Sequence, residues 1–256
     1  PAVTTAITPP TSAAKPKSSP PPPPATPVAD AERPLAGRVV LLDPGHNGGN
    51  WTNPAAIARE VWAGTHYKPC DTFGARTAND YREAAHNWDV ALRVRALLRA
   101  DGARVILTRR SNTGTGPCIT RRAAIGNRAR AHAAVSIHAD GADGHDLRGF
   151  HVIVPRRVAG QTARMVSRSR ALGVAIRNAL RDHGPTPVSN YQGERGIIAR
   201  DDLGGLNLST VPKVFTEIGN MRSRHDAQII ESPAGRQREA EAIALGLRRF
   251  LTGRRA

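Results

Sequence analysis

Hydrophobic positions along the chain form short apolar runs that alternate with longer stretches of helical periodicity. The run RVVLLDPG at 38–45 predicts a buried strand that Asp-Pro-Gly ends. From Tyr81 to Ala100 apolar residues recur every three or four positions, which predicts an amphipathic helix stopped by Asp101-Gly102. The same patterns predict strands at 103–109, 133–140, 149–155 and 213–219, and helices at 120–131, at 162–182 and around Ala240, Ile243, Leu247 and Phe250.

This alternation of strands and helices predicts a single three-layer α/β/α domain around a mainly parallel, twisted sheet. The chain has 256 residues, of which 39% are hydrophobic but only 4% aromatic, so the core must consist mainly of Ala, Val, Ile and Leu. Such a core suits parallel strands that are buried on both faces. We expect the domain to occupy residues 35–256, and we see no internal repeat.

Residues 1–34 differ from the rest of the chain, because they are dense in Pro, Ala, Ser and Thr. Such a composition cannot bury a core and predicts a disordered, Pro-rich leader or linker. A leader of this kind suits a mature secreted, periplasmic or cell-wall protein whose signal peptide has been removed. No segment approaches the roughly 18–20 apolar residues that cross a bilayer, so no membrane span is expected.

The two cysteines, Cys70 and Cys118, form no CxxC pair and lie in Gly-, Pro- and Thr-rich surroundings. They could be two free thiols, but an oxidising compartment and their loop contexts favour a disulfide. A bridge across a loop of this length would stabilise the fold by about 4 kcal/mol in the chain-entropy model.

Three of the predicted strands end in side chains that can perform chemistry. His46 follows the first strand, His138 ends SIH in the third, and Glu217 lies in FTEIG of the last. Sites in open α/β sheets form outside the carboxyl ends of strands, so these side chains are expected to meet. Two imidazoles and a carboxylate around an open position form a common catalytic zinc set. The residues alone leave the third ligand open between Glu83 and His86, because Glu-x-x-His on a helix can itself bind metal.

These motifs, taken in order, resemble the Amidase_3 family of zinc-dependent N-acetylmuramoyl-L-alanine amidases, which hydrolyse peptidoglycan. The resemblance covers about residues 36–251. It rests on LLDPGH, on a glutamate ahead of an amphipathic helix (YREAAHNWDVALRVRALL), on VILTR, on Ile119, Arg122 and Gly126-Asn127 before SIHAD, and on FTEIGNM. Each piece alone is weak, but their joint order is specific.

The resemblance implies that His46, Glu83 and His138 bind Zn²⁺ and that Glu217 is the general base that activates the attacking water. The substrate would be peptidoglycan, cut at the amide between N-acetylmuramic acid and L-alanine. In the family the glutamate lies closer to DPGH, so a loop at about 49–80 is inserted here; it could form a hairpin beside the cleft, anchored through Cys118. SIHAD replaces the family's SIHAN, and a phenylalanine common after the last motif is missing.

The charge of the chain bears on its partners. Lys and Arg number 37 against 21 Asp and Glu, which makes the formal net charge +16. This charge favours attraction to anionic cell-envelope polymers. No nucleic-acid partner is expected, because no finger spacing or aromatic-interleaved basic motif accompanies the charge. We expect a monomer. The alternative functions are a zinc carboxypeptidase or endopeptidase that acts on the stem peptide, and a non-catalytic wall-binding protein.

Overall fold

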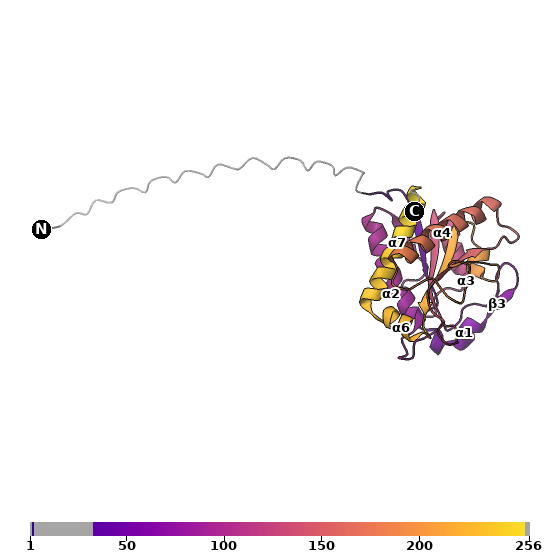
Figure 1. Cartoon of the computed structure of the whole chain (residues 1–256). Helices are drawn as coiled ribbons and strands as arrows, with labels where there is room; N and C mark the ends of the chain where they lie inside the picture. Colours follow the sequence, from indigo (N-terminus) through magenta and orange to yellow (C-terminus); the bar gives the residue numbers. More distant parts are fainter. Residues whose placement is uncertain (1, 3–32, 254–256) are drawn as a thin grey trace.

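The computed structural model describes Ala2 and residues 33–253. A six-stranded sheet runs in the order β4-β1-β5-β8-β6-β7, and its helices cover both faces (Figure 1). The strands of this sheet are β1 (Val39–Pro44), β4 (Arg104–Leu107), β5 (Ala133–Asp140), β6 (His151–Pro155), β7 (Ile197–Arg200) and β8 (Lys213–Asn220). The main helices are α2 (Glu83–Ala100), α3 (Ile119–Arg128), α4 (Ala163–His183), α6 (Arg224–Glu231) and α7 (Pro233–Thr252), with short turns η2 (Asn50–Thr52), α1 (Pro54–Ala58) and α5 (Gly204–Asn207).

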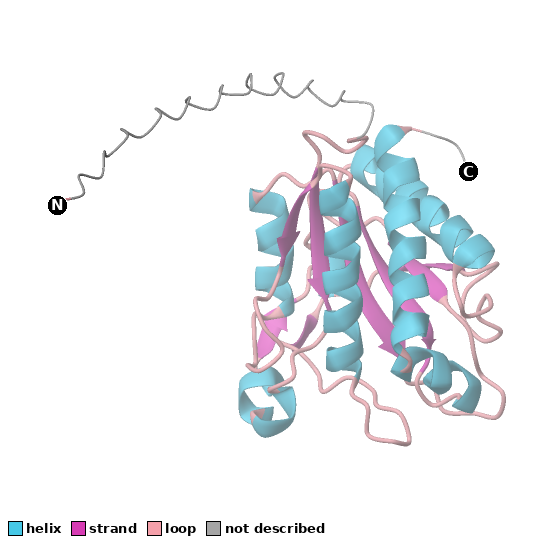
Figure 2. Ribbon diagram, turned by 90° about the vertical axis from the view of Figure 1, so that its left-hand side faces the viewer, coloured by secondary structure: helices cyan, strands magenta, loops and turns pink. Residues whose placement is uncertain are grey.

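The larger core lies between the sheet and the long helices α2, α7 and α4, which pack side by side over one face (Figure 2). Alternate strand residues such as Leu42 and Val135 meet Val94 and Ile243 from these helices, and all four are fully buried. The opposite face has a smaller cluster around Leu41, with α3 beside it. The predicted three-layer, mainly parallel α/β fold is therefore confirmed.

Polar side chains lie on the face of the sheet that has the smaller hydrophobic cluster. Residues two apart in a strand share a face, so Asp43 lies on the same side of β1 as Leu41, and His138 on the same side of β5 as Ala134. The register pairs His138 with Glu217 on β8 at the carboxyl end of the sheet. The side chains predicted to form a site thus come together at the carboxyl end of the sheet.

The fold differs from the predicted pattern in three places. β7 was not expected, because IIAR at 197–200 is too short a run beside glycine and charged residues to indicate a strand. β6 pairs antiparallel with β8, so the last two strands of the sheet run against the other four. The C-terminal region forms two helices, since Ser232-Pro233 ends α6 and begins α7.

The segment at about 49–80, which is predicted to be an insert, contains α1 and the expected hairpin, formed by β2 (Glu60–Trp62) and β3 (Tyr67–Pro69). The disulfide between Cys70 and Cys118 is present. The prediction for residues 1–34 falls almost wholly outside the described residues. Over the part of the chain that the structure describes, no helix combines the length and apolar character needed to cross a bilayer.

Candidate metal centre and cleft

The turn after β1 places His46 beside His138. His46 adopts a left-handed backbone conformation with φ 53°, which histidine tolerates better than most residues. Gly45 lies directly under the His138 ring, and a Cβ at this position would come within 2.0 Å of Cε1. The two imidazoles meet edge to face with their centroids 4.9 Å apart. The glycine of DPGH is thus needed for the close approach of β1 to His138.

Glu83, the first residue of α2, joins the two imidazoles. Its Oε1 lies 2.8 Å from His138 Nδ1 and its Oε2 lies 3.2 Å from His46 Nε2. The backbone N–H of Ala75 donates to Oε2 at 2.8 Å, and the Asn87 amide donates to Oε1 at 3.1 Å. These polar contacts fix the orientation of the carboxylate.

His46, Glu83 and His138 each offer a ligand atom, and these atoms lie within 4.8 Å of one another. Two nitrogen donors and one carboxylate oxygen in this geometry could hold a divalent metal ion. Gly74 (φ 77°) brings the inserted loop against the group, since a Cβ there would lie 2.8 Å from both Glu83 Oε2 and His46 Cδ2. The donor set is therefore compact, enclosed and chemically suited to a metal.

Burial and the neighbouring charges together set the pKa values of these three residues. Burial disfavours the charged form of His46, but Glu83 and Asp71 outweigh burial and raise the pKa of His46 to about 10. Burial lowers the pKa of His138 although Glu83 acts in the opposite direction, and the neighbouring His46 charge adds to the lowering. Burial alone would raise the pKa of Glu83, yet the two imidazoles hold it well below its usual range. The site thus stabilises an ionised carboxylate next to positive charge.

Glu217 lines the same cleft; the residue is half-buried, and its Oε2 is shielded from solvent. Burial raises the pKa of Glu217 well above its usual range, and the carboxylates of Glu83 and Asp140 raise it further. Among the described residues, its Oε2 has no hydrogen-bond partner. A cavity of about 580 Å³ is lined by Glu217 together with His46, Glu83 and His138. An unpartnered carboxyl at a cavity with a metal-binding geometry is a candidate proton acceptor.

His86, the alternative third ligand, lies elsewhere. Its Nε2 contacts Glu239 Oε2 on α7 at 2.7 Å, and both side chains are fully buried between α2 and α7. Residues three apart share a helix face, so the contacts rather than the spacing separate the two: His86 packs against α7, whereas Glu83 contacts the two histidines. The geometry therefore groups Glu83 rather than His86 with the two histidines.

A buried ionic cluster supports the floor of the cleft. Asp43 accepts hydrogen bonds from Lys213 Nζ at 2.8 Å, Arg122 at 2.9 Å and Ser136 at 2.7 Å. Arg109 of VILTR donates to the carbonyls of Pro44 and Ala84 and so joins the DPGH turn to α2. The arginines noted in the family motifs thus have structural roles beneath the metal-binding geometry.

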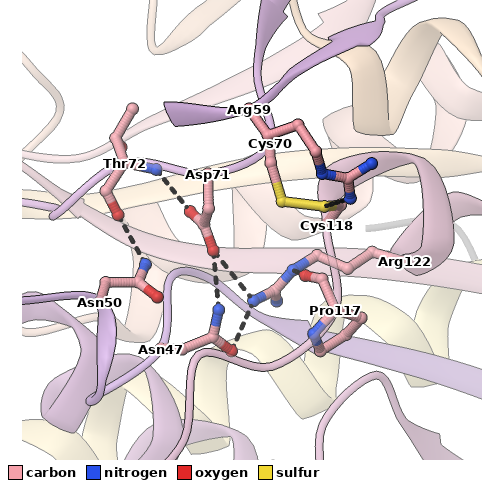
Figure 3. Close-up of a disulfide and its surroundings, with 9 residues drawn as sticks. All are labelled: Asn47, Asn50, Arg59, Cys70, Asp71, Thr72, Pro117, Cys118 and Arg122. Carbon is pink, nitrogen blue, oxygen red and sulfur yellow. Dashed lines mark hydrogen bonds and ion pairs between the residues drawn. A yellow bond between two sulfur atoms is a disulfide. The ribbon is translucent and has the colours of Figure 1, made fainter. Parts of the chain in front are cut away.

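The loop at 49–80 adds contacts that the sequence did not indicate. Figure 3 shows Asp71, next to the disulfide, directed towards Asn47 and Arg122. Asp71 also contacts His46 Nδ1 at 3.1 Å. Lys213 was likewise missed, because a lysine before an apolar strand is usually exposed, whereas here only 1% of it is exposed. Neither residue carried a local signal, since both act through partners distant in sequence.

Comparison with known proteins shows the family to which the chain belongs. The family model described as N-acetylmuramoyl-L-alanine amidase matches residues 40–249. An N-acetylmuramoyl-L-alanine amidase of Mycobacterium tuberculosis is 40% identical over 220 residues, which cover 85% of this chain and 88% of that protein.

Solved structures of the same kind also match. The N-acetylmuramyl-L-alanine amidase of Mycobacterium smegmatis is 40% identical with a TM-score of 0.80, over 86% of this chain and 99% of that one. The amidase of Mycobacterium abscessus, in its apo form, is 36% identical with a TM-score of 0.78, over 85% and 100% of the two chains. The chain therefore belongs to the Amidase_3 family of N-acetylmuramoyl-L-alanine amidases.

Proposed function

We propose that this protein is a zinc-dependent N-acetylmuramoyl-L-alanine amidase that acts on peptidoglycan. The observation that carries the proposal is the meeting of His46, Glu83 and His138 around one point, beside the unpartnered carboxyl of Glu217. Membership of the family supports the reaction class, and its relatives are named for the same amide bond.

In this proposal His46, Glu83 and His138 hold Zn²⁺, because two imidazoles and one carboxylate are a common catalytic zinc set. Bound zinc would act as a Lewis acid that polarises the scissile carbonyl and makes water easier to deprotonate. Glu83 keeps both imidazoles in place.

Glu217 is the proposed general base. It accepts a proton from the water that attacks the lactyl carbonyl carbon, and it passes that proton to the leaving nitrogen as the carbon–nitrogen bond breaks. The products are a lactyl carboxylate on the sugar and a stem peptide with a free L-alanine amino group. Among the described residues no hydrogen bond engages Oε2 of Glu217, so this oxygen is not committed to another partner.

The surroundings of the cleft suit an anionic polymer. Lys68, Arg200 and Arg222 line the same cavity, and the chain carries a net charge of +16. Stem-peptide carboxylates and anionic envelope polymers would be attracted to such a surface. We propose that a monomeric catalytic domain at 35–256 acts outside the cell, in the periplasm or cell wall, where the disulfide is stable.

Digestion of purified peptidoglycan with mass spectrometry of the products tests the proposal. Released peptides with intact L-alanine amino ends are expected, with loss of activity on chelation and recovery on adding Zn²⁺. Products cut within the stem peptide would instead indicate a carboxypeptidase or endopeptidase. Tight binding to walls without any cleavage would indicate a non-catalytic wall-binding protein.

A further inference from the structure

Asp71 lies in the inserted loop, yet it contacts the DPGH histidine. We propose that Asp71 is a positioning residue that orients His46 for metal binding, and that the Cys70–Cys118 disulfide holds it there. The integrity of the disulfide would then set the affinity of the protein for its metal. This inference rests on the zinc site of the proposed function.

The two nitrogens of His46 face different groups. Nε2 points to Glu83 Oε2 at 3.2 Å, on the side of the metal-binding geometry. Nδ1 lies 3.1 Å from Asp71 Oδ1 and 3.1 Å from the carbonyl oxygen of Thr72. Both of these atoms are acceptors, so they favour the tautomer in which Nδ1–H donates and Nε2 keeps its lone pair for a metal. A carboxylate at this position also makes the imidazole a stronger ligand.

The Asp71 carboxylate is itself fixed in place. The Asn47 amide donates to Oδ2 at 2.8 Å, and the Thr72 backbone N–H donates to Oδ1 at 2.8 Å. Arg122 approaches Oδ2 at 3.5 Å, and only 8% of Asp71 is exposed. A buried carboxylate with these partners can hold the ring of His46 in one orientation.

The disulfide joins the two segments that form this arrangement (Figure 3). Cys70 directly precedes Asp71, and its carbonyl accepts from the Ile119 N–H at 3.1 Å. Cys118 directly precedes α3, and its carbonyl accepts from the N–H of Arg122. The covalent bridge therefore fastens the Asp71 segment to the helix that carries Arg122. Without the bridge, non-covalent contacts alone would keep the loop at the metal-binding geometry.

The test measures zinc affinity of the full chain by competition with a chromophoric chelator. Asp71→Ala should weaken zinc binding by about 10- to 100-fold, the usual effect of removing a partner of a metal-ligating histidine. Asp71→Asn keeps an acceptor oxygen and should recover part of the affinity. The Cys70→Ser/Cys118→Ser pair should weaken binding in the same direction. The visible spectrum of the Co²⁺-loaded protein should change in Asp71→Ala, which a purely structural role would not produce.

Asp80→Asn is the matched control. Asp80 lies in the same insert and carries the same charge, but its carboxylate is exposed and contacts Arg76. Its φ of 61° is also tolerated by asparagine. Zinc affinity of Asp80→Asn should equal that of the wild type.

The outcomes separate this inference from the proposed function. If the wild type binds zinc and Asp71→Ala binds it within about twofold, the positioning role is wrong while the zinc site stands. If the serine pair keeps the wild-type affinity and far-UV circular dichroism shows it folded, the link to the disulfide is wrong. If zinc affinity of the wild type does not exceed that of Glu83→Ala, the zinc site of the proposed function is wrong.

Discussion

Replacement of Lys213 by methionine tests how the floor of the cleft is held together. Lys213 begins β8, only 1% of it is exposed, and its Nζ donates to Asp43 Oδ2 at 2.8 Å. Methionine has a similar length and fills the same volume without a charge. The change therefore removes one ionic partner of Asp43 and leaves the packing nearly intact.

The magnitude follows from the partners that remain. Breaking a buried ion pair by removing one partner costs about 3–5 kcal/mol. Arg122 still donates to Asp43 Oδ1 at 2.9 Å and Ser136 to Oδ2 at 2.7 Å, so Lys213→Met should cost about 3 kcal/mol, the low end of that range. Asp43→Asn should cost more, about 5 kcal/mol, because Lys213 and Arg122 would then remain buried without their shared carboxylate. The double variant should be less destabilised than the sum of the two single variants.

Urea unfolding followed by tryptophan fluorescence measures these differences. The pH dependence adds a check. Burial alone would raise the pKa of Asp43, but Lys213 and Arg122 hold it well below its usual 3.8. The ionised carboxylate therefore stabilises the fold fully above pH 3.8, and this stability is lost as the pH falls through the lowered pKa. A Lys213→Met variant within 0.5 kcal/mol of the wild type at pH 7, on the scale of an ordinary surface substitution, or strictly additive effects in the double variant, would refute the reasoning.

Three further outcomes are expected. Glu217→Gln should lower peptidoglycan hydrolysis by about 100- to 10,000-fold without a change in zinc affinity, and an unchanged rate would remove the general base assignment. Asp140→Asn removes one of the charges that raise the pKa of Glu217, after burial and Glu83, so the acid limb of the rate profile should move to lower pH; a shift to higher pH would contradict this. Burial lowers the pKa of His86, but the contact with Glu239, and to a smaller extent the charge of Glu83, raise this pKa above 6.5 overall. The stability difference between wild type and His86→Gln should therefore be full below pH 6.5 and decline as the pH rises through the raised pKa, measured by urea unfolding; a difference that grows with pH would contradict the ion pair.

The residue pattern predicts most elements in their correct order and marks the ends of the strands. Apolar runs closed by Asp-Pro-Gly or followed by Ser-Ile-His indicated where buried strands stop, and parallel topology then implied that His46 and His138 meet. These features depend on residues that are close together in the chain, so the sequence pattern alone can predict them. The antiparallel β6 and the short β7 were not predicted, because the direction of a strand depends on which neighbour it pairs with.

Contacts between elements that are distant in the sequence determine which residues act together. Glu83 and His86 were equivalent by spacing alone, and the packing of α2 against α7 separated them by giving His86 a buried partner in Glu239. Lys213 became an ion-pair partner only because β1 and β8 flank β5 and direct both side chains to the same face. Asp71 reached His46 only through the fold of the insert and its disulfide. Periodicity and motifs record what a residue does within its own element, whereas contacts between distant elements depend on the close packing of the whole domain.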